Sequence, residues 1–177
     1  KSLLSFRTFA ILLLCLLSAN TAWALNSATL FFVGVPKEVQ VGQRFSVSVK
    51  VGSSAESVNA VSGSLSFPDS LLSVVSISKE KSVINLWISE PTVARNKISF
   101  EGVILNPGFE GSSGQVFNIT FEGKKSWKVF LNFNEGSVLA NDGRGSNILG
   151  NLGSASLSVV SSVAHTPGEK EPESNIT

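Results

Sequence analysis

The chain has 177 residues, of which 42% are hydrophobic and only 15% charged. The 14 basic and 13 acidic residues nearly balance and form no extended basic stripe, so nucleic acid is not expected as a partner. Catalytic side chains are scarce, because the only histidine is His165 and the only aspartates are Asp69 and Asp142. We therefore expect a binding protein that is not an enzyme and needs no cofactor.

Residues 1–24 have the pattern of a secretory signal peptide. Two basic residues give a positive start, residues 9–17 are apolar, and Ala22-Trp23-Ala24 supplies the small residues that signal peptidase accepts. The apolar run is shorter than the ~20 residues of a membrane span. Cys15 lies inside it, so the chain after residue 24 has no cysteine and no disulfide. We expect a secreted protein, associated with a prokaryotic cell surface.

Hydrophobic and polar side chains alternate with a two-residue period through the predicted domain, residues 25–163. The alternating stretches are 45–51, 61–67, 98–100, 117–121, 129–133 and 155–159. Turn-forming residues such as Asn106-Pro107-Gly108 separate them. About nine short strands with this punctuation predict an all-β fold, an antiparallel two-sheet β-sandwich of the jelly-roll type. The inner faces are expected to hold Phe45, Phe67, Phe100, Phe117, Phe121, Phe133, Leu65, Ile119 and Leu131.

Three further stretches depart from simple alternation. Residues 70–77 are rich in β-branched side chains and are predicted as a strand, whereas residues 83–88 are ambiguous and are expected to end at Pro91. The glycines of residues 108–114 have a spacing that can hold a phosphate. Residues 116–121 alternate as a strand, however, so there is no helix N-terminus to bind one. We expect a loose chain reversal there, followed by a core strand from Gln115.

The polar turn at residues 141–147 is a weak calcium candidate. Asn141, Asp142 and Asn147 supply one carboxylate and two amides, and the spacing does not fit an EF-hand loop. A tight Asn-Asp-Gly turn explains the same residues without a metal. No other metal site is predicted.

Two tryptophans after residue 24 are the aromatic candidates for binding a sugar ring. Trp127 has the same alternation parity as Val129 and Leu131, which places it at the edge of the core. Trp87 has the parity of Asn85 and is therefore the better candidate for an exposed ring. A carbohydrate surface is accordingly predicted around Trp87.

The tail, residues 164–177, is rich in proline and glutamate and is predicted to be an extended linker. Its composition leads us to expect that the natural protein continues into a further domain or a membrane or wall anchor.

Taken in order, the strands resemble those of a cohesin module over residues 28–160. The matching stretches are 41–51, 58–69, 72–77, 98–102, 111–121 and 141–145. The chain departs from the family pattern at Phe67-Pro68-Asp69, where cohesins often have a tyrosine and an aspartate before the proline. The resemblance implies a nine-stranded jelly roll that binds dockerin modules through one sheet face and helps to assemble polysaccharide-degrading enzymes.

Two binding functions and a structural one are left open by the sequence. A protein-docking face would use the polar residues Asn59, Ser62, Ser64 and Asn85, with a dockerin-like module as partner. A carbohydrate-binding module would use Trp87, with a polysaccharide as partner. The third alternative is a spacer domain of a surface adhesin.

Overall fold

The computed structural model describes residues 28–162 as a domain of ten β-strands without a helix. The strands are β1 (Ala28–Val33), β2 (Glu38–Gln40), β3 (Arg44–Ser66), β4 (Leu72–Ser78), β5 (Leu86–Ala94), β6 (Lys97–Val103), β7 (Phe109–Gly123), β8 (Trp127–Ala140), β9 (Leu149–Leu152) and β10 (Ser154–Val160). The predicted all-β class is thereby confirmed. The predicted signal peptide and the tail from residue 164 lie outside the described residues.

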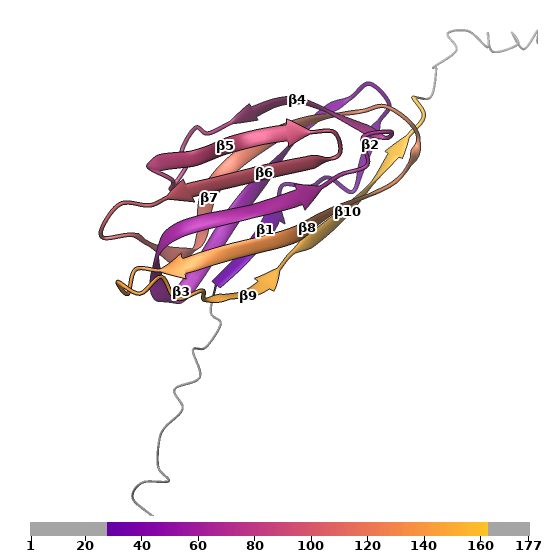
Figure 1. The fold of residues 1–177 in the computed structure, drawn as a ribbon. Helices are drawn as coiled ribbons and strands as arrows, with labels where there is room; N and C mark the ends of the chain where they lie inside the picture. Colours follow the sequence, from indigo (N-terminus) through magenta and orange to yellow (C-terminus); the bar gives the residue numbers. More distant parts are fainter. Residues whose placement is uncertain (1–27, 163–177) are drawn as a thin grey trace, which may run out of the picture.

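Strand β3 runs through both layers of the sandwich (Figure 1). Its first part pairs with β1 and β7, and its second part, from Val58, pairs with β6 and β8. One layer therefore has the order β9-β1-β3-β7-β4, and the other has the order β5-β6-β3-β8-β10-β2. The pairs are antiparallel, as predicted, except for the parallel pairs β1–β9 and β10–β2.

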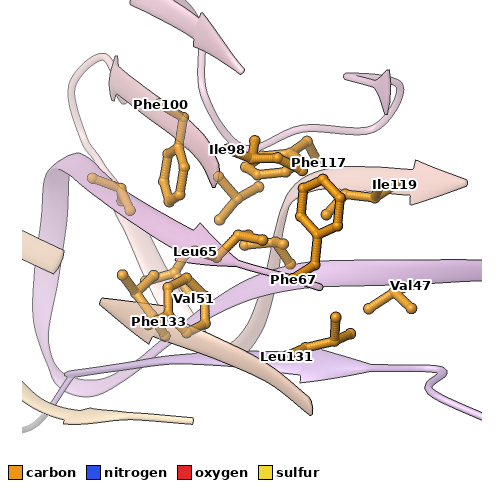
Figure 2. Close-up of a cluster of buried hydrophobic side chains, with 14 of the residues drawn as sticks. Val47, Val51, Leu65, Phe67, Ile98, Phe100, Phe117, Ile119, Leu131 and Phe133 are labelled. Carbon is orange, nitrogen blue, oxygen red and sulfur yellow. The ribbon is translucent and has the colours of Figure 1, made fainter. Parts of the chain in front are cut away.

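The core lies between the two layers and is built from the alternating side chains (Figure 2). Phe100 and Phe117 meet edge to face with their ring centres 5.0 Å apart, and Phe67 packs on Phe121 at 5.4 Å. The residues predicted for the inner faces are buried, except Phe45, which is partly buried against Phe121. Each large apolar side chain buried in this way stabilises the fold by roughly 1.5–3 kcal/mol, so the domain has a substantial core.

Strand β5 does not end at Pro91, contrary to the sequence prediction. It runs on to Ala94, and its pairing with β6 shifts between Ser89 and Thr92. β5 pairs with β6 and lies at the edge of its sheet, where a residue without a backbone N–H is tolerated. The proline is therefore accommodated in an irregular edge strand.

The glycine-rich stretch belongs to strand β7, which begins at Phe109 and not near Gln115 as predicted. The reversal is confined to Asn106-Pro107-Gly108, where Gly108 has a φ of 87°. The ring of Phe109 folds back over the strand, and a Cβ on Gly114 would lie 2.6 Å from it. Gly114 thus makes room for an aromatic ring, which is why this stretch resembles a ligand loop in sequence but is a strand in structure.

Candidate functional site

The candidate site is the outer face of β8, β3, β6 and β5. Residues paired across neighbouring strands point to the same side of a sheet, so the pairing defines what this face presents. Four rows of side chains cross it: Leu86-Val103-Ala60-Leu139, Ser89-Glu101-Ser62-Ser137, Thr92-Ser99-Ser64-Glu135 and Ala94-Lys97-Ser66-Asn132. We call these sixteen residues the β8–β3–β6–β5 face.

Hydroxyl groups dominate the middle of this face. A shallow hollow of about 330 Å³ is lined there by Ser62, Ser99, Ser137 and Glu135, together with Gly63, Phe100 and Gly136. Gly63 and Gly136 contribute backbone to its floor, since a Cβ on either would point inward, towards Phe100 and Leu30 respectively. Serine hydroxyls donate and accept hydrogen bonds, so the hollow offers both kinds of group to a ligand or partner.

The carboxylate of Glu135 is held in place on this face by two hydrogen bonds. Lys97 Nζ lies 3.1 Å from Glu135 Oε1, and Ser64 Oγ donates to the same oxygen at 2.9 Å. The hydrogen bond from Lys97 and then that from Ser64 lower the pKa of Glu135 below its ordinary value. Glu135 is therefore held in its charged form beside the hollow, while the exposed Glu101 adds a second negative charge one row away.

One end of the face is apolar. Leu86 on β5 is 53% exposed, and it shares a row with Val103, Ala60 and Leu139. A face that places such a row next to hydroxyls and charges has the mixed character of protein-binding surfaces.

The structure places two of the predicted docking residues on this face. Ser62 lines the hollow, and Ser64 is buried beneath Glu135. Asn59 lies at a shift in the pairing of β3 with β8, and its side-chain oxygen is buried without a hydrogen-bond partner among the described residues. Asn85 precedes β5 and accepts a hydrogen bond from the backbone N–H of Leu105 at 2.9 Å. Neither asparagine belongs to the four rows.

The predicted exposure of the two tryptophans is wrong in both cases. Trp87 pairs with Gly102 on the inner side of β5 and is partly buried against the core, with Lys79 Nζ 5.9 Å from its ring centre. Trp127 is 70% exposed, because the strand begins there, at the end of the sandwich and beyond the core that covers Val129. The half-burial of Trp87 does not favour a carbohydrate surface centred on that ring.

Most residues of the face were not predicted from the sequence. Ser99 and Glu101 could have been found, because they alternate with the buried Ile98 and Phe100. Glu135 could not be found by alternation, because the pairing of β3 with β8 shifts between Ser64 and Leu65. That shift turns Glu135 outward although it has the parity of the buried Phe133.

The calcium candidates are each engaged in different hydrogen bonds. Asp142 accepts hydrogen bonds from the hydroxyl of Ser146 and from the backbone N–H of Arg144, and these lower its pKa to about 2. Asn141 donates to Asn106 and Pro107, and the side-chain oxygen of Asn147 accepts from the backbone of Val138 and of Leu149. Their contacts support the alternative of a tight turn.

Within residues 28–162, no cluster of three or more histidine, cysteine or acidic side chains is arranged to hold a metal ion. The same part of the chain contains no helix that is long and apolar enough to cross a membrane.

The solved structures that this domain resembles are cohesin modules. A non-cellulosomal cohesin from the archaeon Archaeoglobus fulgidus is 19% identical, with a TM-score of 0.61 over 76% of this chain and 91% of that chain. The seventh ScaB type I cohesin from Pseudobacteroides cellulosolvens is 15% identical, with a TM-score of 0.62 over 82% and 98%. A type I cohesin–dockerin complex from Clostridium thermocellum is 14% identical, with a TM-score of 0.61 over 76% and 99%.

The domain therefore has the fold of a cohesin module, as the sequence resemblance implied. No protein-family model matches the chain, and a search of curated proteins found no match. At these identities the likeness defines the fold, and the function has to be argued from the surface.

Proposed function

We propose that the domain is a non-catalytic docking module that binds a dockerin-like protein module through the β8–β3–β6–β5 face. The observation that carries this proposal is the hydroxyl-lined hollow, which lies between the Lys97–Glu135 pair and the apolar row around Leu86. Apolar contacts supply most of the affinity of such surfaces, and hydrogen bonds with fixed charges supply the orientation.

The opposite face of the sandwich is less suited to a partner. Its polar side chains bond to one another: Ser48 Oγ donates to Asn118 Oδ1 at 2.6 Å, and Arg44 Nε lies 2.9 Å from Glu122 Oε2. A partner there would have to replace bonds that already exist. On the β8–β3–β6–β5 face such bonds hold Glu135 and Ser66. No side-chain hydrogen bond joins Ser62, Ser99 or Ser137 of the hollow to another described residue, so these hydroxyls are available to a partner.

The setting that we propose is extracellular. Residues 1–24 would direct secretion, residues 25–163 would form the docking domain, and residues 164–177 would link it to a further domain or an anchor at the cell surface. A type I cohesin of this fold has been solved in complex with a dockerin. The corresponding role here is to hold a partner in a polysaccharide-degrading or cell-surface assembly.

The test is a binding experiment with two arginine variants. Ser62→Arg fills the hollow, whereas Ser46→Arg puts the same side chain on the exposed opposite face. Wild type and both variants serve as baits for the culture fluid of the source organism. Each captured protein that carries a dockerin-like calcium repeat is then purified and titrated calorimetrically.

We expect Ser62→Arg to weaken the titrated affinity roughly 30-fold or more, the cost of disrupting a central interface position, and Ser46→Arg to bind like wild type. Equal binding by wild type and Ser62→Arg would show that the partner uses another surface. Capture of no dockerin-like module by wild type would count against the docking function itself.

A further inference from the structure

A second surface lies at the end of the sandwich where the chain turns from β7 into β8. A shallow pocket of about 350 Å³ is lined there by Ser70, Leu71, Lys125 and Trp127. The indole of Trp127 is 70% exposed. Ser137, in the hollow of the β8–β3–β6–β5 face, lies ten residues after Trp127 on β8, which is ~30 Å at the rise of an extended strand. The two surfaces are therefore separate.

The walls of this pocket are fixed to one another. The backbone N–H of Lys124 donates to the carbonyl of Leu71 at 2.7 Å, and Lys124 Nζ donates to the carbonyl of Asp69 at 2.8 Å. Trp127 is paired with Val159 of β10 on its other side. The turn and the β3–β4 loop are therefore joined without a ligand, and little ordering is needed when one binds.

The pocket lies in a positively charged part of the surface. Lys124, Lys125 and Lys128 occupy three of five consecutive positions, and all three are exposed. None of them forms an ion pair with another described residue, and the nearby Glu122 is already paired with Arg44. Lys124 contacts the backbone carbonyl of Asp69, and the exposed Glu38 lies two strands from Lys128, across Ser158, so the lysines outnumber the acidic residues here. The charges of this end therefore favour an anionic ligand.

We propose that the Trp127 pocket binds an acidic polysaccharide, a glycan whose sugar rings carry carboxylates. The indole offers a flat apolar surface for the C–H face of a sugar ring. Lys125 lies beside the ring and pairs with the carboxylate, and the hydroxyl of Ser70 is placed to bond a sugar hydroxyl. Such a ligand would contact both the exposed ring and the lysines, neither of which belongs to the β8–β3–β6–β5 face.

A glycan fits this surface better than an anionic membrane does. Membrane-binding segments insert several large apolar side chains, whereas Trp127 is the single aromatic of this pocket and Leu71 is half-buried. Phe130, the next exposed aromatic on β8, does not line the pocket. The lining is concave and partly polar, as in sites for small rigid groups.

The proposal is tested by electrophoresis of the full chain through native gels that contain a polysaccharide. Polygalacturonate is the acidic probe, and a soluble neutral β-glucan is the matched neutral probe. Trp127→Ala and Lys125→Gln remove the ring and the charge. Phe130→Ala removes an exposed ring outside the pocket, and Lys81→Gln removes a lysine at the opposite end of the molecule, since β4 leads away from Gly123 towards it.

We expect wild type and both control variants to be retarded by polygalacturonate but not by the neutral glucan, and retardation to weaken with added salt. Trp127→Ala should raise the dissociation constant roughly tenfold, the upper range for one aromatic contact, with a smaller rise for Lys125→Gln. Because Trp127 is exposed, the unfolding temperature of Trp127→Ala should match that of wild type, which checks the fold.

Three electrophoresis results would overturn the proposal. They are equal retardation of wild type and Trp127→Ala, equal retardation by the neutral glucan, and no retardation by polygalacturonate at all. Sedimentation of the protein with phosphatidylglycerol vesicles, without any glycan binding, would also overturn it, because the pocket would then bind an anionic lipid surface. Loss of dockerin binding in Ser62→Arg is a separate readout, so the two functions fail independently.

Discussion

Asp142 holds the turn between β8 and β9 with its own carboxylate. Oδ1 accepts the backbone N–H groups of Arg144 and Gly145 at 2.8 and 3.0 Å, and Ser146 donates its hydroxyl to Oδ2. The Ser146 hydroxyl and then the Arg144 N–H lower the pKa of Asp142 from 3.8 to about 2. The folded state therefore favours the charged carboxylate.

A lowered pKa makes stability depend on pH in a defined window. The stabilisation by Asp142 is complete above pH 3.8 and is lost as the pH falls towards 2, where the folded protein also binds the proton. We predict that Asp142→Asn has a lower unfolding temperature than wild type at pH 6, and that this difference shrinks between pH 4 and pH 2. Calorimetric scans of both proteins across this range measure it. A difference that does not change with pH would contradict the assignment.

Single residues were predicted well where burial decided their position and poorly at the ends of strands. Leu65 and Ile119 are inward because alternation and apolarity agree. The parity of Trp127 is that of a core residue, but the strand begins there and no opposing side chains cover the ring. Sequence alternation carries no signal for where a sheet ends, so it could not show that Trp127 is exposed.

At the level of the element, β8 shows both faces of a strand in two neighbouring residues. Leu131 is fully buried, whereas Phe130 is 53% exposed, with Lys128 Nζ 5.2 Å from its ring centre. We predict that Leu131→Ala lowers the free energy of unfolding by about 2–5 kcal/mol, because it leaves a cavity in the core. Phe130→Ala should cost less than about 1 kcal/mol, as an exposed substitution.

Urea denaturation of the two variants beside wild type gives both values. Equal losses would mean that the strand has a different register from the one described. The larger loss in Phe130→Ala would reverse the inner and outer faces of β8.

The elements themselves were largely predictable, because a period of two residues is a strong signal when one face of a strand is buried. The exceptions are irregularities of pairing. β5 passes Pro91 with a shift against β6, and β8 shifts against β3 beside Ser64. Such bulges turn a side chain to the other face, and they depend on the partner strand. The β8–β3–β6–β5 face, which includes Glu135, could therefore be recognised only from the three-dimensional pairing.

On the scale of the whole molecule, β3 makes the two layers one cooperative unit. Its residues pair with β1 and β7 in one layer and with β6 and β8 in the other. Neither layer can come apart without disturbing the strand that the other needs. We predict one unfolding transition, with the same midpoint by far-UV circular dichroism and by tryptophan fluorescence.

The same transition should be unaffected by a reducing agent, because the only cysteine, Cys15, precedes the domain. Two separate midpoints would show that the layers unfold independently. A midpoint that moves on reduction would indicate a stabilising bond that involves Cys15.

The first and last strands enter and leave the sandwich at opposite ends (Figure 1). β1 lies between β3 and β9, and β10 lies between β8 and β2, so each has hydrogen-bonded neighbours on both sides. A pull on Ala28 and Val160 acts along these strands, across hydrogen bonds that run perpendicular to them. Many bonds must then break together, so the domain can carry tension between its two ends while the β8–β3–β6–β5 face stays intact.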